Sequence, residues 1–132
     1  MNLEKEIFKI VERLKREEKA LILVEGRRDG ESLKNIGIHS EIICISQKNM
    51  YDLTLDLSKK DKKIIILTDF DSEGTKLFRN YRKELESLGA NIDATYYKEL
   101  KFHLKKFIKG IEYIDNFLLT HRTSRPYSYN PE

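Results

Sequence analysis

The sequence has little of several features that would narrow its class at once. Its 132 residues contain one cysteine, two prolines and no tryptophan. The single cysteine, Cys44, excludes an internal disulfide, and its apolar neighbours predict a buried thiol rather than a nucleophile. No apolar run approaches the roughly 20 residues that a membrane helix needs, so we expect no segment that spans a bilayer.

Neither sign of charge is in large excess. Lysine and arginine together number 25 and aspartate and glutamate 22, which leaves a net charge of +3 at pH 7. This balance does not separate a nucleic-acid-binding protein from other enzymes, so a preference for phosphate has to come from local clusters. Residues 1–6 are acidic in character and lack the basic start and apolar core of a signal peptide, which predicts a cytoplasmic location.

Hydrophobic periodicity divides the chain into short elements. Residues 3–19 place Ile7, Ile10 and Leu14 at helical spacing among charges, which predicts an amphipathic helix. Short apolar runs of the kind that forms buried strands follow at residues 20–24, 41–45, 64–67 and, more weakly, 92–97. Helical stretches separate them at residues 29–36, 50–57 and 72–88, and the last stops at Gly89 as a C-cap.

Strands that alternate with helices indicate right-handed crossovers and a mainly parallel sheet. We therefore predict a single-domain α/β protein with three α/β/α layers and a sheet of about four strands. Its expected parts are an N-terminal amphipathic helix at residues 1–19, an α/β core at 20–100, a helical segment packed on that core at 101–120, and an irregular basic and aromatic tail at 121–132.

Two of the predicted strands end in carboxylates and glycines. Glu25 and Gly26 follow the first strand, and Asp69, Asp71 and Gly74 follow the third. Ligands of parallel sheets bind beyond the carboxyl ends of the strands. Residues two apart in an extended segment project to one side, so Asp69 and Asp71 can converge. If the first and third strands are neighbours, Glu25 joins them.

Carboxylates held this close repel one another unless a cation lies among them. Mg²⁺ prefers oxygen ligands and usually takes one or two carboxylates together with water and phosphate oxygens, and Mn²⁺ can take its place. A metal held in this way neutralises a phosphodiester and stabilises a leaving oxygen. Gly26 and Gly74 suit such a site because they let backbone or phosphate approach closely.

The acids of these motifs also have structural interpretations. Asp71 precedes a predicted helix and could serve as its N-cap, although its pairing with Asp69 and Glu25 favours a metal ligand. Asp29 lies just before a helical stretch, so a cap or a hydrogen-bonded support of the ligands is favoured over direct ligation. Glu73 suits the positive end of the helix dipole, and contact with metal-bound water is the alternative.

Cations flank both motifs. Arg27 and Arg28 follow Glu25 at the start of a helix, where they either bind phosphate together with backbone N–H groups or remain solvated. Lys76 and Arg79 lie one helical turn apart near the same edge and have the same two interpretations.

A basic and aromatic stripe follows the predicted core. Its cations are Lys101, Lys105, Lys106 and Lys109, and the tail continues this character with Arg122, Arg125, Tyr127 and Tyr129. Cations that follow a phosphate backbone and rings that stack on bases suit single-stranded nucleic acid. A solvated helix face is the alternative.

The two acidic motifs together resemble the Toprim domain. The pattern Val-Glu-Gly-x-x-Asp occupies residues 24–29, and Asp-x-Asp-x-x-Gly occupies residues 69–74. The resemblance covers roughly residues 20–100 and implies that the first and third strands lie side by side. It also implies that Glu25 is a general acid or base and that Asp69 and Asp71 bind the metal. The chain has no zinc-binding cysteine set of a primase and no gate domain of a topoisomerase, so it is similar to small stand-alone nuclease-like or primase-like members.

Three functions follow as hypotheses. The leading one is Mg²⁺-dependent cleavage of a phosphodiester, or nucleotidyl transfer, on RNA or DNA. The second is a non-catalytic module that binds metal and nucleic acid with a protein partner in a larger RNA-processing or replication assembly. The third is a phosphohydrolase with Asp69 as nucleophile, but the Asp-x-Asp loop of such enzymes follows the first core strand.

Overall fold

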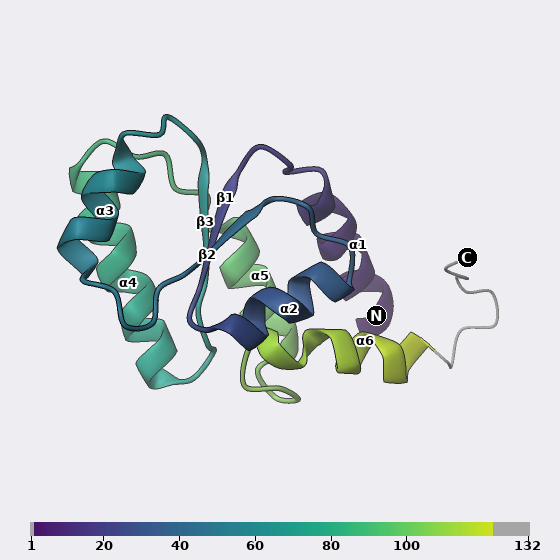
Figure 1. Ribbon diagram of the computed structural model, residues 1–132. Coiled ribbons are helices and arrows are strands. Elements are labelled where there is room, and N and C mark those ends of the chain that lie inside the picture. The colour runs from purple at the N-terminus through teal and green to yellow at the C-terminus, as the bar shows by residue number, and fades with distance from the viewer. Residues whose placement is uncertain (1, 123–132) are drawn as a thin grey trace.

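A small parallel sheet lies at the centre of the computed structural model, which describes residues 2–122 (Figure 1). Its strands are β1 (Leu21–Val24), β2 (Glu41–Cys44) and β3 (Ile64–Leu67), in the order β2-β1-β3. All residues of β1 and β3 are buried, whereas β2 is only half-buried at the sheet edge, Cys44 included. The first and third strands are therefore neighbours.

The fourth predicted strand does not form within the described residues, so the expectation of about four strands is wrong. Ile92 makes a single isolated bridge with Ile64, and the chain then turns into helix α5 (Thr95–Leu104). The Asp93 carboxylate accepts a hydrogen bond from the Thr95 backbone N–H at 3.0 Å and satisfies the first free amide of this helix. Tyr96 and Tyr97 are buried on α5 instead.

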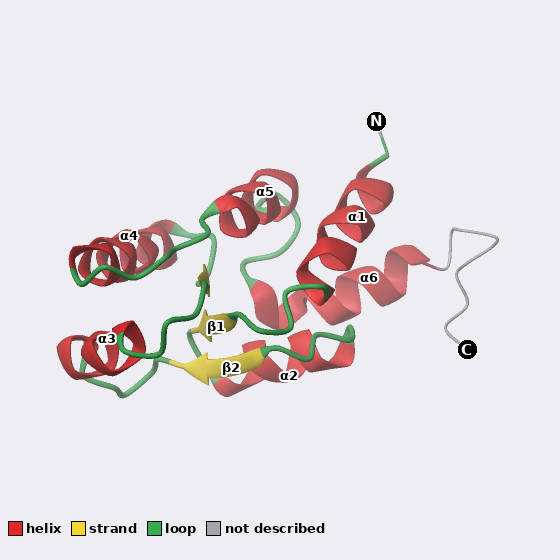
Figure 2. Ribbon diagram, turned by 90° about the horizontal axis from the view of Figure 1, so that it is seen from above, coloured by secondary structure: helices red, strands yellow, loops and turns green. Residues whose placement is uncertain are grey.

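Helices cover both faces of the sheet (Figure 2). One face carries α3 (Met50–Ser58) and α4 (Ser72–Ser87). The other carries α1 (Leu3–Lys15), α2 (Arg27–Asn35), α5 and α6 (Ile114–Arg122), with the short 3-10 helix η1 (Ile111–Tyr113) leading into α6. The predicted α/β/α architecture with a parallel sheet is confirmed. Within residues 2–122, no helix is both long and apolar enough to cross a membrane.

Several helix boundaries differ from the sequence prediction. Helix α1 ends at Lys15 rather than near residue 19, because the next two N–H groups bond back to Arg13 and Leu14 in a turn. Helix α5 begins before residue 101, and α6 continues to Arg122, past the predicted start of the tail. The rest of that tail, with Arg125, Tyr127 and Tyr129, lies outside the described residues.

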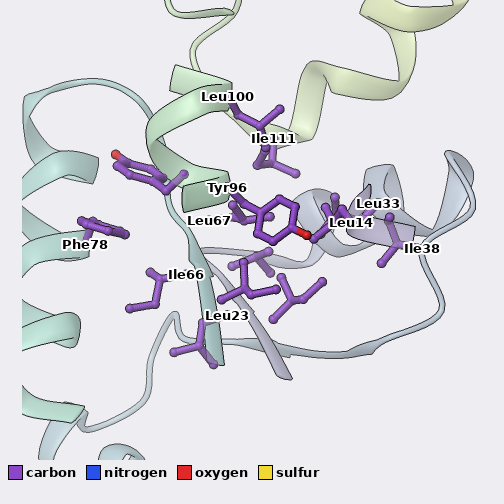
Figure 3. Close-up of a cluster of buried hydrophobic side chains, with 14 of the residues drawn as sticks. Leu14, Leu23, Leu33, Ile38, Ile66, Leu67, Phe78, Tyr96, Leu100 and Ile111 are labelled. Carbon is purple, nitrogen blue, oxygen red and sulfur yellow. The ribbon is translucent and has the colours of Figure 1, made fainter. Parts of the chain in front are cut away.

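One hydrophobic core holds the layers together (Figure 3). Leu23 of β1 and Ile66 of β3 lie near its centre, Leu14 of α1 and Leu100 of α5 pack from one side, and Phe78 of α4 packs from the other. Each fully buried leucine or isoleucine side chain contributes roughly 1.5–3 kcal/mol through the hydrophobic effect. This packing fixes the carboxyl ends of β1 and β3 side by side.

Candidate metal and nucleic-acid site

The two acidic motifs meet at the carboxyl edge of the sheet. Val24, the last residue of β1, pairs with Leu67, the last residue of β3, so Glu25 and Asp69 leave the sheet at the same edge. The Asp69 backbone N–H donates a hydrogen bond of 2.8 Å to Glu25 Oε2. Glu25 Oε1 makes no hydrogen bond with any described residue, so one oxygen of this carboxylate remains available for proton transfer.

Asp69 is fixed by close packing around its backbone and carboxylate. A Cβ added at Gly74 would overlap the Asp69 carbonyl oxygen, and one added at Gly110 would overlap Asp69 Oδ1. The same carbonyl accepts a hydrogen bond of 2.6 Å from the Tyr97 hydroxyl. Glycine is therefore required at both positions for the chain to pack against Asp69.

The electrostatics of Asp69 are unfavourable without a cation. Burial, followed by the negative charges of Glu25, Asp29 and Asp71, raises the pKa of Asp69 from 3.8 to about 6. Only Lys109 acts in the opposite direction among the named causes. The acids are thus close enough to repel one another.

Asp71 begins helix α4 as its N-cap. Its Oδ1 accepts a hydrogen bond of 2.8 Å from the Gly74 backbone N–H, so the structural interpretation of this residue applies. Its other oxygen, Oδ2, lies 3.8 Å from the Lys109 ammonium nitrogen. A cap bond through one oxygen leaves the second oxygen able to ligate a metal.

Asp29 caps helix α2 from within. Its Oδ2 accepts a hydrogen bond of 2.8 Å from the Gly26 backbone N–H, while Oδ1 is buried without a hydrogen-bond partner in the described part of the chain. Burial is the largest cause that raises the pKa of Asp29, and the negative charges of Glu112 and Glu25 add to it. The hydrogen bond from the Gly26 amide opposes this increase. The sequence interpretation as a cap or support matches these contacts.

In the described part of the chain, Glu73 and the four predicted cations lie around this edge without a hydrogen bond or ion pair to the carboxylates of the two motifs. Glu73, Lys76 and Arg79 are exposed on α4. Arg27 and Arg28 are exposed at the start of α2, and Arg27 lies 3.7 Å from Glu31 as a solvated ion pair. Unlike Gly74, Gly26 has room for a side chain, because an added Cβ would meet no atom closer than Asp29 Oδ2 at 3.9 Å.

Sequence reasoning did not place Lys109 and Gly110 in the site. They follow α5, and the Lys109 carbonyl oxygen accepts a hydrogen bond of 2.7 Å from the Phe70 backbone N–H, which joins this segment to the end of β3. Both residues lie far along the chain from the two motifs, so the sequence pattern does not indicate this contact. The one available signal was a glycine between the apolar residues Ile108 and Ile111.

Within residues 2–122, no group of three or more His, Cys, Asp or Glu side chains is spaced to ligate one metal ion together. A ligand set of three carboxylates is therefore not formed. Two carboxylates with water and phosphate oxygens are sufficient for Mg²⁺.

Both acidic motifs lie in a region that matches a known family model. The family model of the Toprim domain matches residues 20–103, which include both acidic motifs. This chain belongs to the Toprim domain family. Toprim membership supports a metal-dependent role related to nucleic acid.

Several relatives of this Toprim chain have similar lengths. A UPF0292 protein of Pyrococcus furiosus is 41% identical over 104 residues, which span 79% of this chain and 77% of that protein. A UPF0292 protein of Thermococcus sibiricus is 36% identical over 121 residues, or 92% of this chain and 94% of that protein. A solved structure of a protein from Aquifex aeolicus superimposes with a TM-score of 0.70 at 31% identity, covering 80% of this chain and 95% of that one.

The Toprim match does not include the whole candidate site. Lys109 and Gly110 lie beyond residue 103 and still contact Asp71 and Asp69. The candidate site therefore includes a segment that lies outside the matched residues.

Proposed function

We propose that this Toprim protein acts on the phosphodiester backbone of RNA or DNA, cleaving it or transferring a nucleotidyl group, with Mg²⁺ or Mn²⁺ as cofactor. The observation that supports this most directly is the meeting of Glu25 and Asp69 at the carboxyl edge, with Asp71 two residues away. Membership of the family supports the coarser part of the proposal, a metal-dependent role related to nucleic acid.

The donor set fits a hard divalent cation. Asp69 and Asp71 would hold the ion, since carboxylate oxygens are the protein ligands that Mg²⁺ prefers and one or two are usual. Burial, and after it the neighbouring negative charges, raise the pKa of Asp69 to about 6, and Lys109 offsets this effect only in part. A bound Mg²⁺ supplies charge neutralisation at the scissile phosphate and at the leaving oxygen.

Glu25 is suited to moving a proton. The Asp69 amide fixes its Oε2, and Oε1 faces no donor in the described residues, so it can accept a proton from an attacking water or hydroxyl or return one to the leaving oxygen. Asp29 supports this arrangement by holding the Gly26 amide, and Glu73 can contact metal-bound water from the first turn of α4.

Phosphate groups would be oriented by cations around the edge. Arg27 and Arg28 begin α2, and Lys76 and Arg79 lie on α4, all with exposed side chains. Guanidinium groups hydrogen-bond phosphate in pairs, and lysines act as point charges.

The test is incubation of purified protein with labelled single- and double-stranded RNA and DNA in Mg²⁺, in Mn²⁺ or in EDTA. Asp69→Asn and Glu25→Gln should each lower a metal-dependent rate by roughly 10²–10⁴-fold, the usual contribution of such groups. Asp56→Asn, which changes an exposed acid on α3, is the matched control and should leave the rate unchanged. Metal-dependent turnover that survives both site variants would refute the proposed roles.

A second candidate is a module that binds metal and nucleic acid without turnover, as part of a larger assembly. The exposed cations around this edge, Arg27, Arg28, Lys76 and Arg79, favour it, because they can bind phosphate whether or not turnover follows. Tight, salt-sensitive binding to nucleic acid without turnover on any of these substrates would select it. The phosphohydrolase hypothesis has less support, because Glu25, not the Asp-x-Asp loop, follows the first strand β1.

A further inference from the structure

The turn after α5 is held in place against the candidate site. We call residues 105–109, with the sequence Lys-Lys-Phe-Ile-Lys, the lysine turn. At its start, the N–H groups of Phe107 and Ile108 both donate to the Leu104 carbonyl, at 2.8 and 3.0 Å. At its end, the Lys109 carbonyl accepts from Phe70 at 2.7 Å, and Gly110 packs on Asp69. Because both ends are anchored, the backbone of the turn is held beside Asp71.

The lysine turn is strongly basic. No acid occurs between Glu99 and Glu112 in the sequence, whereas this interval contains Lys101 and the three lysines of the turn. A pocket of about 460 Å³ separates the turn from the start of α4, and it is lined by Phe70, Asp71, Lys105, Lys106, Phe107, Ile108 and Lys109. Its one acid, Asp71, is the predicted metal ligand, so a phosphate chain in this pocket would lead directly to the carboxylates.

The turn also presents an aromatic ring to solvent. Phe107 is 57% exposed, and its ring lies 6.0 Å from that of Phe117, centroid to centroid, which supports it from the side of α6. A second pocket, of about 470 Å³, has Phe107, Lys109 and the exposed Tyr113 in its wall. Phe107 and Lys109 therefore belong to two adjoining pockets, with a ring and a cation shared between them.

We propose that the lysine turn binds single-stranded nucleic acid, with Lys105, Lys106 and Lys109 on the phosphates and Phe107 stacked on an unpaired base. This inference rests on the proposed function, since it assigns the form of nucleic acid that reaches Asp69 and Asp71. A duplex keeps its bases stacked inside the helix, so an exposed ring can gain a stacking contact only from an unpaired base.

The test is a binding measurement in EDTA, where turnover does not occur. Fluorescence anisotropy with a short fluorescein-labelled oligothymidylate or oligouridylate, and with a duplex of the same length, gives Kd for each variant. Phe107→Ala should weaken single-strand binding by roughly tenfold, the effect of losing one base stack, and Phe107→Tyr should restore it. Phe102→Ala is the matched control, because Phe102 is 77% exposed on α5 and lies in neither pocket wall.

Charge is tested separately through the dependence on salt. Lys105→Gln/Lys106→Gln should reduce the slope of log K against log salt by roughly 1.4, at about 0.7 for each lost phosphate contact with a single strand. Lys59→Gln/Lys60→Gln, a pair of exposed lysines at the end of α3, should leave the slope unchanged.

The outcomes separate this inference from the proposed function. If Phe107→Ala and Lys105→Gln/Lys106→Gln bind like the unchanged protein, or if duplex is bound more tightly than single strand, the inference is overturned, even when metal-dependent turnover is present. If both variants lose single-strand binding as expected, the inference stands, even when no substrate is turned over.

Discussion

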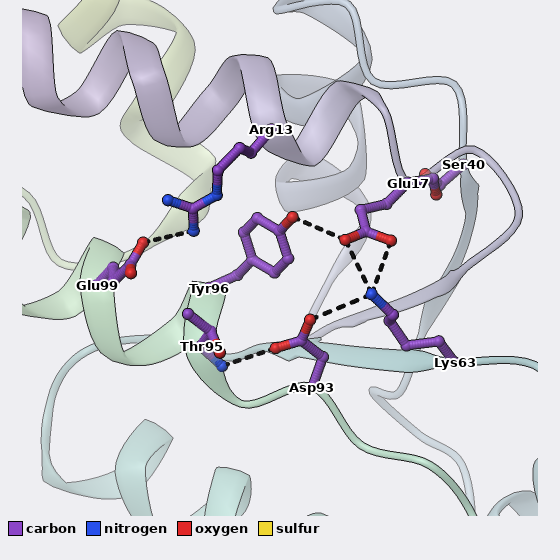
Figure 4. Close-up of polar contacts among 8 residues, drawn as sticks. All are labelled: Arg13, Glu17, Ser40, Lys63, Asp93, Thr95, Tyr96 and Glu99. Atoms are coloured by element: carbon purple, nitrogen blue, oxygen red, sulfur yellow. Dashed lines mark hydrogen bonds and ion pairs between the residues drawn. The ribbon is translucent and has the colours of Figure 1, made fainter.

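The two ends of the parallel sheet carry charged groups in opposite arrangements. At the amino end, the Lys63 ammonium lies 2.9 Å from both Glu17 oxygens and 3.3 Å from Asp93, and the Tyr96 hydroxyl donates to Glu17 at 2.8 Å (Figure 4). At the carboxyl end, four carboxylates share a single edge, namely those of Glu25, Asp29, Asp69 and Asp71. Within the described chain, the one cation that lies within 4 Å of any of them is Lys109, at 3.8 Å from Asp71.

Ionisation responds to the two arrangements in opposite ways. Hydrogen bonding to Glu17 raises the pKa of Lys63 against the effect of burial. Burial disfavours the Asp93 carboxylate, but bonds from Thr95 and Lys63 outweigh it and lower the pKa of Asp93. The pKa of Asp69 is instead raised. Folding therefore favours the charges of Lys63 and Asp93 and disfavours the charge of Asp69, which is the pattern expected of a structural cluster and a functional site.

The largest expected effect comes from breaking the packing at the carboxyl end. Gly74→Ala should lower the free energy of unfolding by about 3 kcal/mol, because the new Cβ overlaps the Asp69 carbonyl. The backbone at residue 74 cannot easily move away from Asp69, because Thr68 Oγ1 donates a hydrogen bond of 2.7 Å to the Gly74 carbonyl. Chemical denaturation measures the change. Gly26→Ala, with no neighbour closer than 3.9 Å, is the control, and an equal loss in both variants would mean that packing on Asp69 is not the cause.

Breaking the amino end should have a smaller effect. Lys63→Met should lower the free energy of unfolding by about 1.5 kcal/mol, because Glu17 and Asp93 are then left facing each other without a cation. The adjacent Lys62→Met is the control and should change stability by no more than about 0.5 kcal/mol, since its ion pair with Glu41 is 3.8 Å long and exposed. Similar losses in both would show that the cluster in Figure 4 does not contribute more than a surface pair.

The smallest expected effect has the opposite sign and depends on pH. Asp69→Asn should raise the free energy of unfolding by about 1 kcal/mol at pH 8. The pKa of Asp69 is about 6 in the folded protein and 3.8 ordinarily, so at pH 8 the folded state carries a charge that it disfavours. As pH falls from 6 to 4, the folded state takes up the proton first and this penalty disappears.

Thermal unfolding of both proteins between pH 4 and pH 8 measures this difference. The stabilisation should be full above the pKa of about 6 and absent near the ordinary value of 3.8. Asp93→Asn is the companion variant and should destabilise the protein at pH 8, because the pKa of Asp93 is lowered. An Asp69→Asn protein that is less stable than the unchanged one at pH 8 would contradict the assignment of repulsion to this edge.

The sheet could be predicted where apolar runs were continuous. The runs that contain Leu21–Val24 and Ile64–Leu67 form strands buried on both faces, as their composition indicates. The structure of residues 92–97 could not be predicted from composition, because threonine and tyrosine favour strands. In the structure, the Asp93 carboxylate instead accepts a hydrogen bond from the Thr95 N–H at the start of a helix. Local propensity did not reveal that single side-chain contact.

The candidate site could be predicted only as far as its motifs. Glu25 and Asp69 follow strands that pair, so their proximity follows from topology. The contacts of Lys109 and Gly110 do not follow from topology, because these residues belong to a separate segment that returns to the end of β3 after α5. Likewise, Tyr97 was expected to pack in a strand, yet from α5 its hydroxyl holds the Asp69 carbonyl.

The hydrogen bond between Phe70 and Lys109 joins the segment that the Toprim model matches to a segment outside that match. A fragment cut at residues 20–103 would retain both acidic motifs and the whole sheet. It would lose Ile7 of α1 and Ile111 of η1, which are fully buried, together with the glycine that packs on Asp69. Transfer of the candidate site to another scaffold would therefore have to include the returning segment at residues 105–111 as well as the two motifs.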